Sequence, residues 1–232
     1  MNTLMVCFGN KEKQKLPYVK VGEETVDPLR DERVAKVVRK QGMKHYCVTP
    51  WSFGQEGVLR CKWLSSPKGI ATNSCGQFIV GDEDDVKIFD PTGQFIRHFS
   101  LPNKTDILDV ATDNKDNIYV LVSGSVYEFS NTADLHHNFF VREGFRLTVT
   151  NSKVLVLSKS IVHVYETDGF FLGSFGEGTL GTYGAYNITA ANDGRVMVVD
   201  WHDCCVHIFS ENGHHLGKFQ LQVFGPCIAF HM

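Results

Sequence analysis

Seven cysteines and ten histidines are the side chains of this sequence best suited to metal or nucleophilic chemistry. Structural zinc sites take their ligands from short, regular spacings such as C-x-x-C, and the sequence contains no such spacing. Cys204 and Cys205 are adjacent, which is too close for a zinc knuckle. An odd number of cysteines also argues against a disulfide framework. We therefore expect a reduced protein with no metal site, no cofactor and no catalytic residue.

Two polar stretches offer binding chemistry instead. In the first, Trp201 and His202 lie between two carboxylates, Asp200 and Asp203, so an apolar anchor would have an acidic rim suited to a basic or amide-rich peptide. The second is an acidic run: Asp82, Glu83, Asp84 and Asp85. We predict that these eight residues contact a partner. The alternatives are that the aspartates only cap turns, that Trp201 packs on a neighbouring element, and that the acidic run is an ordinary solvated loop.

A repeated pattern defines the elements that carry these stretches. A valine is followed three residues later by an aromatic residue and thirteen residues later by a phenylalanine, with a polar turn between. The pattern begins at Val86, Val126, Val162 and Val206. A generic antiparallel meander is the alternative, but three landmarks kept in one register through four copies favour a structural repeat.

Two further short apolar runs precede each valine, so each repeat holds four strands, named a, b, c and d in chain order. Four short antiparallel strands in about 40 residues are typical of a β-propeller blade. The sequence therefore predicts an all-β, incomplete β-propeller with complete blades at about 67–99, 108–139, 146–175 and 187–219 and partial flanking blades. The aromatic landmarks should be buried between blades: Phe89, Phe129, Tyr165 and Phe209.

The blade pattern also places the histidines. His163 and His207 share one position on strand c and are expected to face outward. Five more fall on strand d, the outermost strand: His98, His136, His137, His214 and His215. Histidines spread in this way do not converge on a metal ion, which supports a protein without an active site.

The repeat resembles the NHL family of propellers. The resemblance covers about residues 46–230 and rests on an apolar strand with Ala, a turn such as Asn192-Asp193-Gly194, and an inter-blade segment such as Ser174 to Gly178. Strand c lacks the Trp-Asp ending of a WD blade, and no Gly-Gly doublet of a kelch blade occurs. Cys205 stands where the family usually places Arg, which puts a shared ligand in doubt but not the fold.

The resemblance implies a non-catalytic interaction module. Such propellers are commonly the substrate-recognition part of tripartite-motif (TRIM-NHL) ubiquitin ligases, so a role in ubiquitin-dependent protein turnover is expected. Ligase activity would need a RING domain, whose Cys/His spacing is absent from this sequence. A zinc-dependent lyase-type propeller enzyme is the least favoured alternative, and no small-molecule substrate is expected.

A single-stranded RNA-binding translational regulator is the main alternative. In NHL relatives, the loops that join strand d to strand a and strand b to strand c form the usual binding face. RNA binding there needs basic residues that neutralise phosphates. On these loops acidic residues outnumber basic ones, and the whole chain has a net charge of −3. The count favours a protein or peptide partner on this face.

The ends of the chain fit the repeat less well. Residues 1–45 do not match it and are expected to be a linker or a degenerate segment, in which 31–41 could form a short helix. Residues 46–232 form the propeller, with one strand of a preceding blade near 46–53 and a fifth blade beginning near 226. Neither a signal peptide nor a run of 18 apolar residues is present, so we expect a cytoplasmic protein without a membrane span.

Overall fold

The computed structural model describes residues 19–21, 24–26, 64–150, 152–181, 184–191 and 193–220. The chain divides into two compact units, Met1–Ser52 and Phe53–Met232. In the first unit the described residues form an antiparallel hairpin of β1 (Val19–Val21) and β2 (Glu24–Val26). The possible helix at 31–41 and the partial blades near 46–53 and 226 lie outside the described residues.

The described residues of the second unit form four sheets, each of four antiparallel strands in chain order, which confirms the predicted all-β propeller. Blades 1 and 2 are formed by β3 (Pro67–Thr72), β4 (Phe78–Asp82), β5 (Asp85–Phe89) and β6 (Phe95–Ser100), then β7 (Ile107–Thr112), β8 (Ile118–Val122), β9 (Ser125–Phe129) and β10 (Leu135–Phe140). Blades 3 and 4 are formed by β11 (Arg146–Val149), β12 (Lys153–Ser158), β13 (Ile161–Glu166) and β14 (Phe171–Phe175), then β15 (Ala185–Ala190), β16 (Val196–Asp200), β17 (Cys205–Phe209) and β18 (His215–Gln220).

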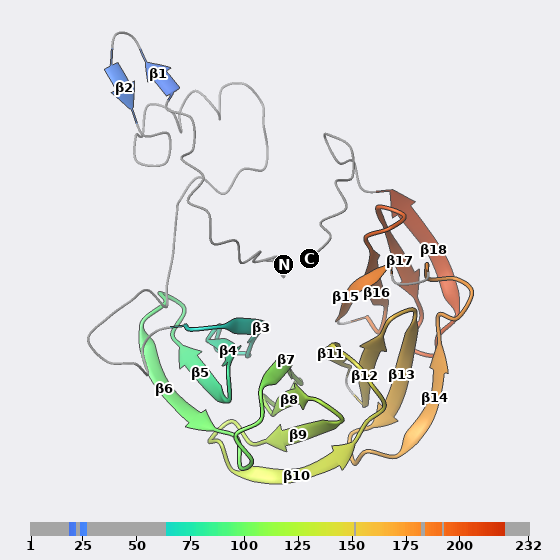
Figure 1. Cartoon of the computed structure of the whole chain (residues 1–232), viewed down its shortest axis with the longest axis horizontal. Coiled ribbons are helices and arrows are strands. Elements are labelled where there is room, and N and C mark those ends of the chain that lie inside the picture. The colour runs from blue at the N-terminus through green and yellow to red at the C-terminus, as the bar shows by residue number, and fades with distance from the viewer. Residues whose placement is uncertain are drawn as a thin grey trace. The chain divides into compact units, whose positions relative to one another are not determined.

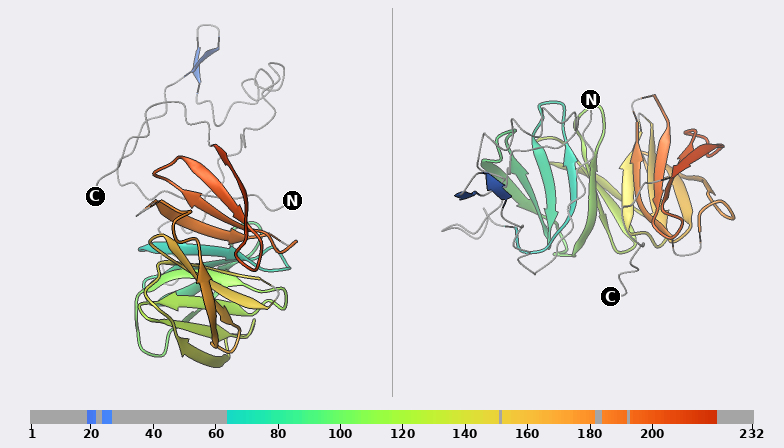
Figure 2. Two further views of the ribbon diagram at one scale, coloured as in Figure 1. Left: turned by 90° about the vertical axis from the view of Figure 1, so that its right-hand side faces the viewer. Right: turned by 90° about the horizontal axis from the view of Figure 1, so that it is seen from above.

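The four blades are arranged as an arc around a common axis (Figure 1). Strands a (β3, β7, β11 and β15) lie innermost and strands d (β6, β10, β14 and β18) outermost, with the strands running roughly along the axis (Figure 2). Every strand d has a bulge beside the aromatic landmark of strand c, as between Ile88 and Phe89. The bulge increases the local twist, which suits the outer edge of a blade.

Three apolar cores lie between successive blades. Ile79 and Ile88 of blade 1 pack with Phe129 of blade 2 in the first core. Two more aromatic landmarks, Tyr165 and Phe209, belong to the cores between blades 2 and 3 and between blades 3 and 4, respectively. All four landmark aromatics are buried, as predicted, with exposures of 1–3%. Because each blade buries its faces on its neighbours, the repeat is stable only as an array.

Candidate functional site

The segments that join strand d to strand a lie beside the loops that join strand b to strand c, so they form one face of the propeller, here the d–a/b–c face. Backbone hydrogen bonds connect the two kinds of segment within a blade or between successive blades. Examples are Leu101 N to Asp84 O at 2.9 Å, Val141 N to Gly124 O at 3.0 Å and Trp201 N to Gly184 O at 2.7 Å. These bonds hold the loops on a rigid scaffold, where binding residues often occur.

Asp200 is buried beneath the loop that it was expected to flank. Its side chain is 0% exposed, Oδ2 accepts a hydrogen bond from Gly181 N at 2.8 Å, and Oδ1 accepts one from Asp203 N at 3.0 Å. A Cβ at Gly184 would lie 2.3 Å from Asp200 Oδ1, so the d–a segment approaches the carboxylate very closely. The acidic rim predicted around Trp201 is therefore wrong at Asp200, because backbone N–H groups occupy this carboxylate.

Asp82 has the same role in blade 1. Its carboxylate accepts hydrogen bonds from Ser65 N at 2.9 Å and Ser66 N at 2.6 Å and contacts Lys87 Nζ at 2.5 Å. With the side chain 1% exposed, the prediction that Asp82 meets a partner is also wrong. An aspartate at the end of strand b thus fastens the preceding d–a segment to its own blade.

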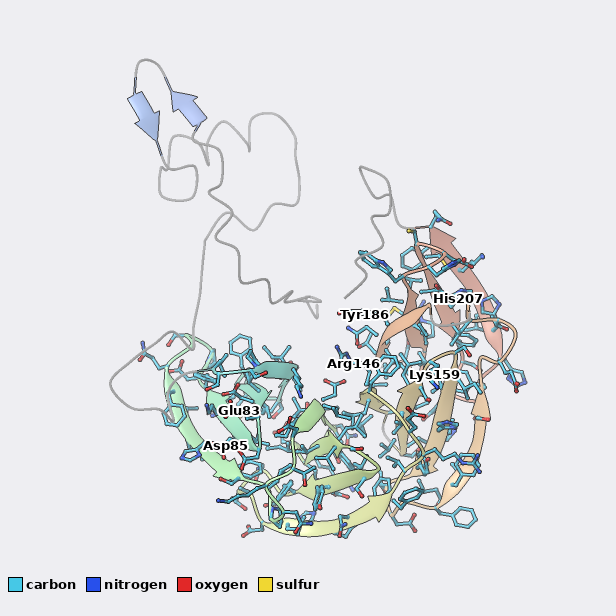
Figure 3. The ribbon with its side chains drawn as sticks, viewed as in Figure 1. Glu83, Asp85, Arg146, Lys159, Tyr186 and His207 are labelled. Atoms are coloured by element: carbon cyan, nitrogen blue, oxygen red, sulfur yellow. The ribbon has the colours of Figure 1, made fainter. Side chains whose placement is uncertain are left out.

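The rest of the acidic run stays nearer to the surface. Glu83 is exposed, Asp84 and Asp85 are half-buried, and Asp85 Oδ1 accepts a hydrogen bond from Ser100 Oγ at 2.6 Å. Figure 3 shows Glu83 and Asp85 at the blade 1 end of the arc, far from Tyr186 of blade 4. The two predicted stretches therefore belong to different parts of the face and do not form one site.

Trp201 lies in the longest of the four b–c loops, at residues 201–204, and is 38% exposed. Its ring centroid is 6.5 Å from that of Tyr186, which is the second residue of strand a of the same blade and is 44% exposed. Trp201 therefore packs on its own blade and still presents part of its ring. His202 and Asp203 are exposed and contact each other, with Nδ1 and Oδ1 3.2 Å apart.

Arg146 extends this surface to blade 3. Its guanidinium lies 5.9 Å from the Phe145 ring centroid and 5.7 Å from that of Tyr186. Nη1 donates to Phe145 O at 2.8 Å and contacts Leu108 O at 3.5 Å, so the guanidinium is held in place. We call Phe145, Arg146, Tyr186 and Trp201 the aromatic–arginine cluster. Figure 3 shows Arg146 and Tyr186 close together on the inner side of the arc.

The repeat could have indicated this cluster, although sequence reasoning missed it. Phe145 and Tyr186 occupy equivalent positions at the start of strand a, where blades 1 and 2 have Lys68 and Leu108. Arg146 stands at a position where the other blades have short side chains. An alignment of the repeats therefore contains a signal for the cluster. Aromatic residues occupy the same position in two successive copies, and an arginine directly follows the first of them.

His163 and His207 do not face outward as predicted. Both are buried between blades, and burial lowers the pKa of each, so both are neutral near pH 7. His207 Nδ1 lies 3.1 Å from His215 Nε2 of strand d. The pattern misled because strand c has a neighbouring blade on each side, so alternation gives no polar face.

The described part of the chain contains no group of three His, Cys, Asp or Glu side chains placed to hold a metal ion. Cys75 and Cys205 are free thiols, whereas Cys204 is disulfide-bonded, contrary to the expectation that all cysteines are reduced. Among the residues that the structure describes there is no apolar helix of the length that a bilayer requires.

Comparison with known proteins supports the propeller assignment. Protein brain tumor of Drosophila melanogaster is 26% identical over 187 residues, which cover 78% of this chain but only 14% of that protein. No protein-family model matches the chain.

Solved structures share the architecture at low sequence identity. A streptogramin B lyase has a TM-score of 0.55 at 12% identity, covering 68% of this chain and 55% of that one. A glutaminyl cyclase from Myxococcus xanthus has a TM-score of 0.53 at 18% identity, covering 69% of this chain and 76% of that one. At such identities the likeness concerns the fold alone. The four blades show that this chain is a β-propeller, and the similarity to Protein brain tumor supports the resemblance of its repeats to those of the NHL family.

Proposed function

We propose that this propeller is a non-catalytic recognition module that binds a protein partner at the aromatic–arginine cluster of its d–a/b–c face. The observation that carries the proposal is the partial exposure of Tyr186 and Trp201, 44% and 38%, on a backbone held by hydrogen bonds. Exposed Tyr and Trp beside an Arg match the residue types that dominate protein interfaces. Rigid anchors of this kind bind without a large loss of conformational entropy.

In the cell, the module would select substrates for ubiquitin-dependent turnover in the cytoplasm. This part of the proposal rests on the likeness to TRIM-NHL propellers. The ligase chemistry would come from a RING domain, either elsewhere in the parent protein or in a partner.

Single-stranded RNA is a second candidate ligand, favoured by the same cluster. Bases stack on aromatic side chains and on guanidinium planes; the Phe145 and Tyr186 rings adjoin Arg146, and the Trp201 ring adjoins Tyr186. The acidic residues of blade 1 oppose it, because they lie on the same face and repel phosphate. We therefore rank a protein partner first.

Affinity purification with Trp201→Ala and Phe170→Ala variants tests the proposal. Phe170 is 66% exposed and lies in the turn between strands c and d, on the opposite face, so it controls for loss of any exposed aromatic ring. We expect the Trp201 variant to lose a protein partner that the wild type and the Phe170 variant both retain. A partner set unchanged by the Trp201 substitution in a folded protein would refute the proposal. RNA recovered in place of protein would favour the second candidate.

A further inference from the structure

We infer that the aromatic–arginine cluster reads an extended peptide segment in which a carboxylate stands beside a proline or aromatic side chain. The inference rests on the proposed function and specifies its ligand. Arg146 would bind the carboxylate, and the Tyr186 and Trp201 rings would receive the neighbouring apolar side chain.

The first step is the charge of Arg146. No carboxylate of the described residues lies within ion-pair distance of its guanidinium. Asp109, which interacts with Arg146 electrostatically, is buried and accepts hydrogen bonds from Val110 N and Leu147 N. The two backbone carbonyls that contact Arg146 accept hydrogen bonds from Nη1 only. An arginine has five N–H donors, so a fixed cation with donors to spare remains for an external anion.

The second step is the shape of the apolar surface beside that cation. The Tyr186 and Trp201 rings are tilted at 45° with their centroids 6.5 Å apart, and both are more than one-third exposed. Pairs of exposed rings receive proline in extended peptides and other flat apolar side chains. Since the Tyr186 ring also lies against the guanidinium, an anionic and an apolar ligand group would be adjacent residues of one peptide.

The third step separates a peptide from a nucleic acid. A single strand is bound by a row of cations that follows its phosphates. Near Arg146 such a row is missing among the described residues: Lys159 Nζ lies 4.0 Å from Glu143 Oε2, and the Arg142 guanidinium lies over Phe171, 5.0 Å from its ring centroid, on the outer strand of blade 3. One available cation suits one carboxylate better than a chain of phosphates.

A peptide array tests the inference. The probes are immobilised dodecapeptides whose central pair is Glu-Pro, Gln-Pro, Glu-Phe or Gln-Phe, each pair in identical varied flanks. The wild-type protein should bind each Glu peptide about tenfold more strongly than the matching Gln peptide. A charge-assisted hydrogen bond of about 1.5 kcal/mol or more accounts for this difference. Fluorescence anisotropy with the strongest Glu peptide and its Gln match then measures both affinities in solution.

Three variants separate the roles. Arg146→Gln should bind Glu and Gln peptides equally, whereas Trp201→Ala should weaken both and keep their ratio. Arg195→Gln is the matched control, because Arg195 lies in the a–b turn of blade 4 and pairs with Asp193 at 2.7 Å. The ratio within each variant is insensitive to partial unfolding, and thermal unfolding confirms that each protein is folded.

Several results would overturn the inference. They are an absence of peptide binding, equal binding of Glu and Gln peptides to the wild type, a ratio that survives Arg146→Gln, or displacement of the peptide by oligouridylate with tighter, Arg146-dependent binding. If the purified partner depends on Trp201 while the array shows no preference for Glu, the proposed function stands and the peptide assignment fails. If the partner is also independent of Trp201, both fail.

Discussion

At the scale of single residues, one position near the start of strand a is an aspartate in blade 2 and an asparagine in blade 4. Asp109 and Asn187 each accept a hydrogen bond from the next backbone N–H, at 3.0 Å and 2.9 Å. Asp109 also accepts one from Leu147 N of blade 3 at 2.9 Å, and it packs so closely on blade 1 that a Cβ at Gly69 would lie 2.4 Å from its Oδ1. Burial raises the pKa of Asp109 to about 7. Asn187 makes the same local contact without a charge, so an asparagine at position 109 can keep the bond from Val110 N, but its NH2 group cannot accept the bond from Leu147 N.

Asp109→Asn should therefore change how stability depends on pH. A pKa raised on folding means that the folded protein holds the proton more tightly, so the stabilisation is complete below about pH 4 and is lost as pH rises to about 7. The loss should be on the order of 4 kcal/mol for a shift of about three units. We expect the variant to gain stability relative to the wild type between pH 4 and pH 8 in urea unfolding. Exposed Asp106→Asn is the control, and parallel curves for the wild type and Asp109→Asn would contradict the account.

Other individual residues show where sequence reasoning stopped. Trp201 could be recognised as an exposed aromatic residue from its type and its long loop. The burial of Asp82 and Asp200 could not, because it depends on d–a segments that return to the end of strand b. Arg146 and Tyr186 belong to different blades, so their contact appears only when the blades are placed side by side.

At the scale of elements, the turns between strands c and d join neighbouring blades. Gly213, with φ of +81°, packs against Phe175 of blade 3, and Gly169, with φ of +94°, packs against Phe139 of blade 2. Side-chain hydrogen bonds reinforce the same junction, as from Thr150 Oγ1 to Glu211 Oε1 at 2.7 Å. The phenylalanine landmark on strand d of one blade therefore packs against the turn glycine of the next blade.

Gly213→Ala should destabilise the propeller more than Gly194→Ala. Both glycines have φ of +81°, so the left-handed backbone costs alanine about 1 kcal/mol at either position. At Gly213 a Cβ would also lie 2.6 Å from Phe175 Cβ, whereas at Gly194 the nearest atom would be 3.7 Å away. Overpacking should add roughly 1–3 kcal/mol at Gly213 only. Equal free energies of unfolding for the two variants would show that the turn does not clamp the blades.

Truncation of an aromatic landmark should have the largest effect on stability. Phe209 is 1% exposed, and its ring centroid is 5.0 Å from that of Phe175. Phe209→Ala should lower the free energy of unfolding by about 3–5 kcal/mol, as in other buried large-to-small substitutions. Chemical denaturation measures the change, with exposed Phe170→Ala expected to stay close to the wild type. A loss below about 1 kcal/mol at Phe209 would be incompatible with its buried position.

The strands themselves were predictable because a local pattern determines them. Val86 and Phe89 lie on opposite faces of one strand, and both are buried. The same spacing recurs at Val206 and Phe209. Polar residues on strand c were harder. His207 occupies a place that alternation marks as exposed, and only the neighbouring blade and His215 explain its burial.

At the scale of the whole propeller unit, the d–a/b–c face has an acidic part and a separate aromatic part with an arginine. Glu83, Asp84 and Asp85 belong to blade 1, whereas the aromatic–arginine cluster spans blades 3 and 4 (Figure 3). A count of charged loop residues treats this face as uniformly acidic and so hides the division. The division predicts that a partner binds mainly at blades 3 and 4, because binding energy concentrates at exposed aromatic and arginine side chains.

Site-specific photo-crosslinking tests the central claim, that this face at blades 3 and 4 recognises a protein, most directly. A photoreactive phenylalanine analogue is placed at Trp201, or at Phe170 on the opposite face as the control, and irradiated in cells. The account predicts crosslinked species from position 201 that are absent from position 170, are destroyed by protease and persist after ribonuclease treatment. Crosslinks that disappear with ribonuclease, or that form equally from both positions, would contradict it.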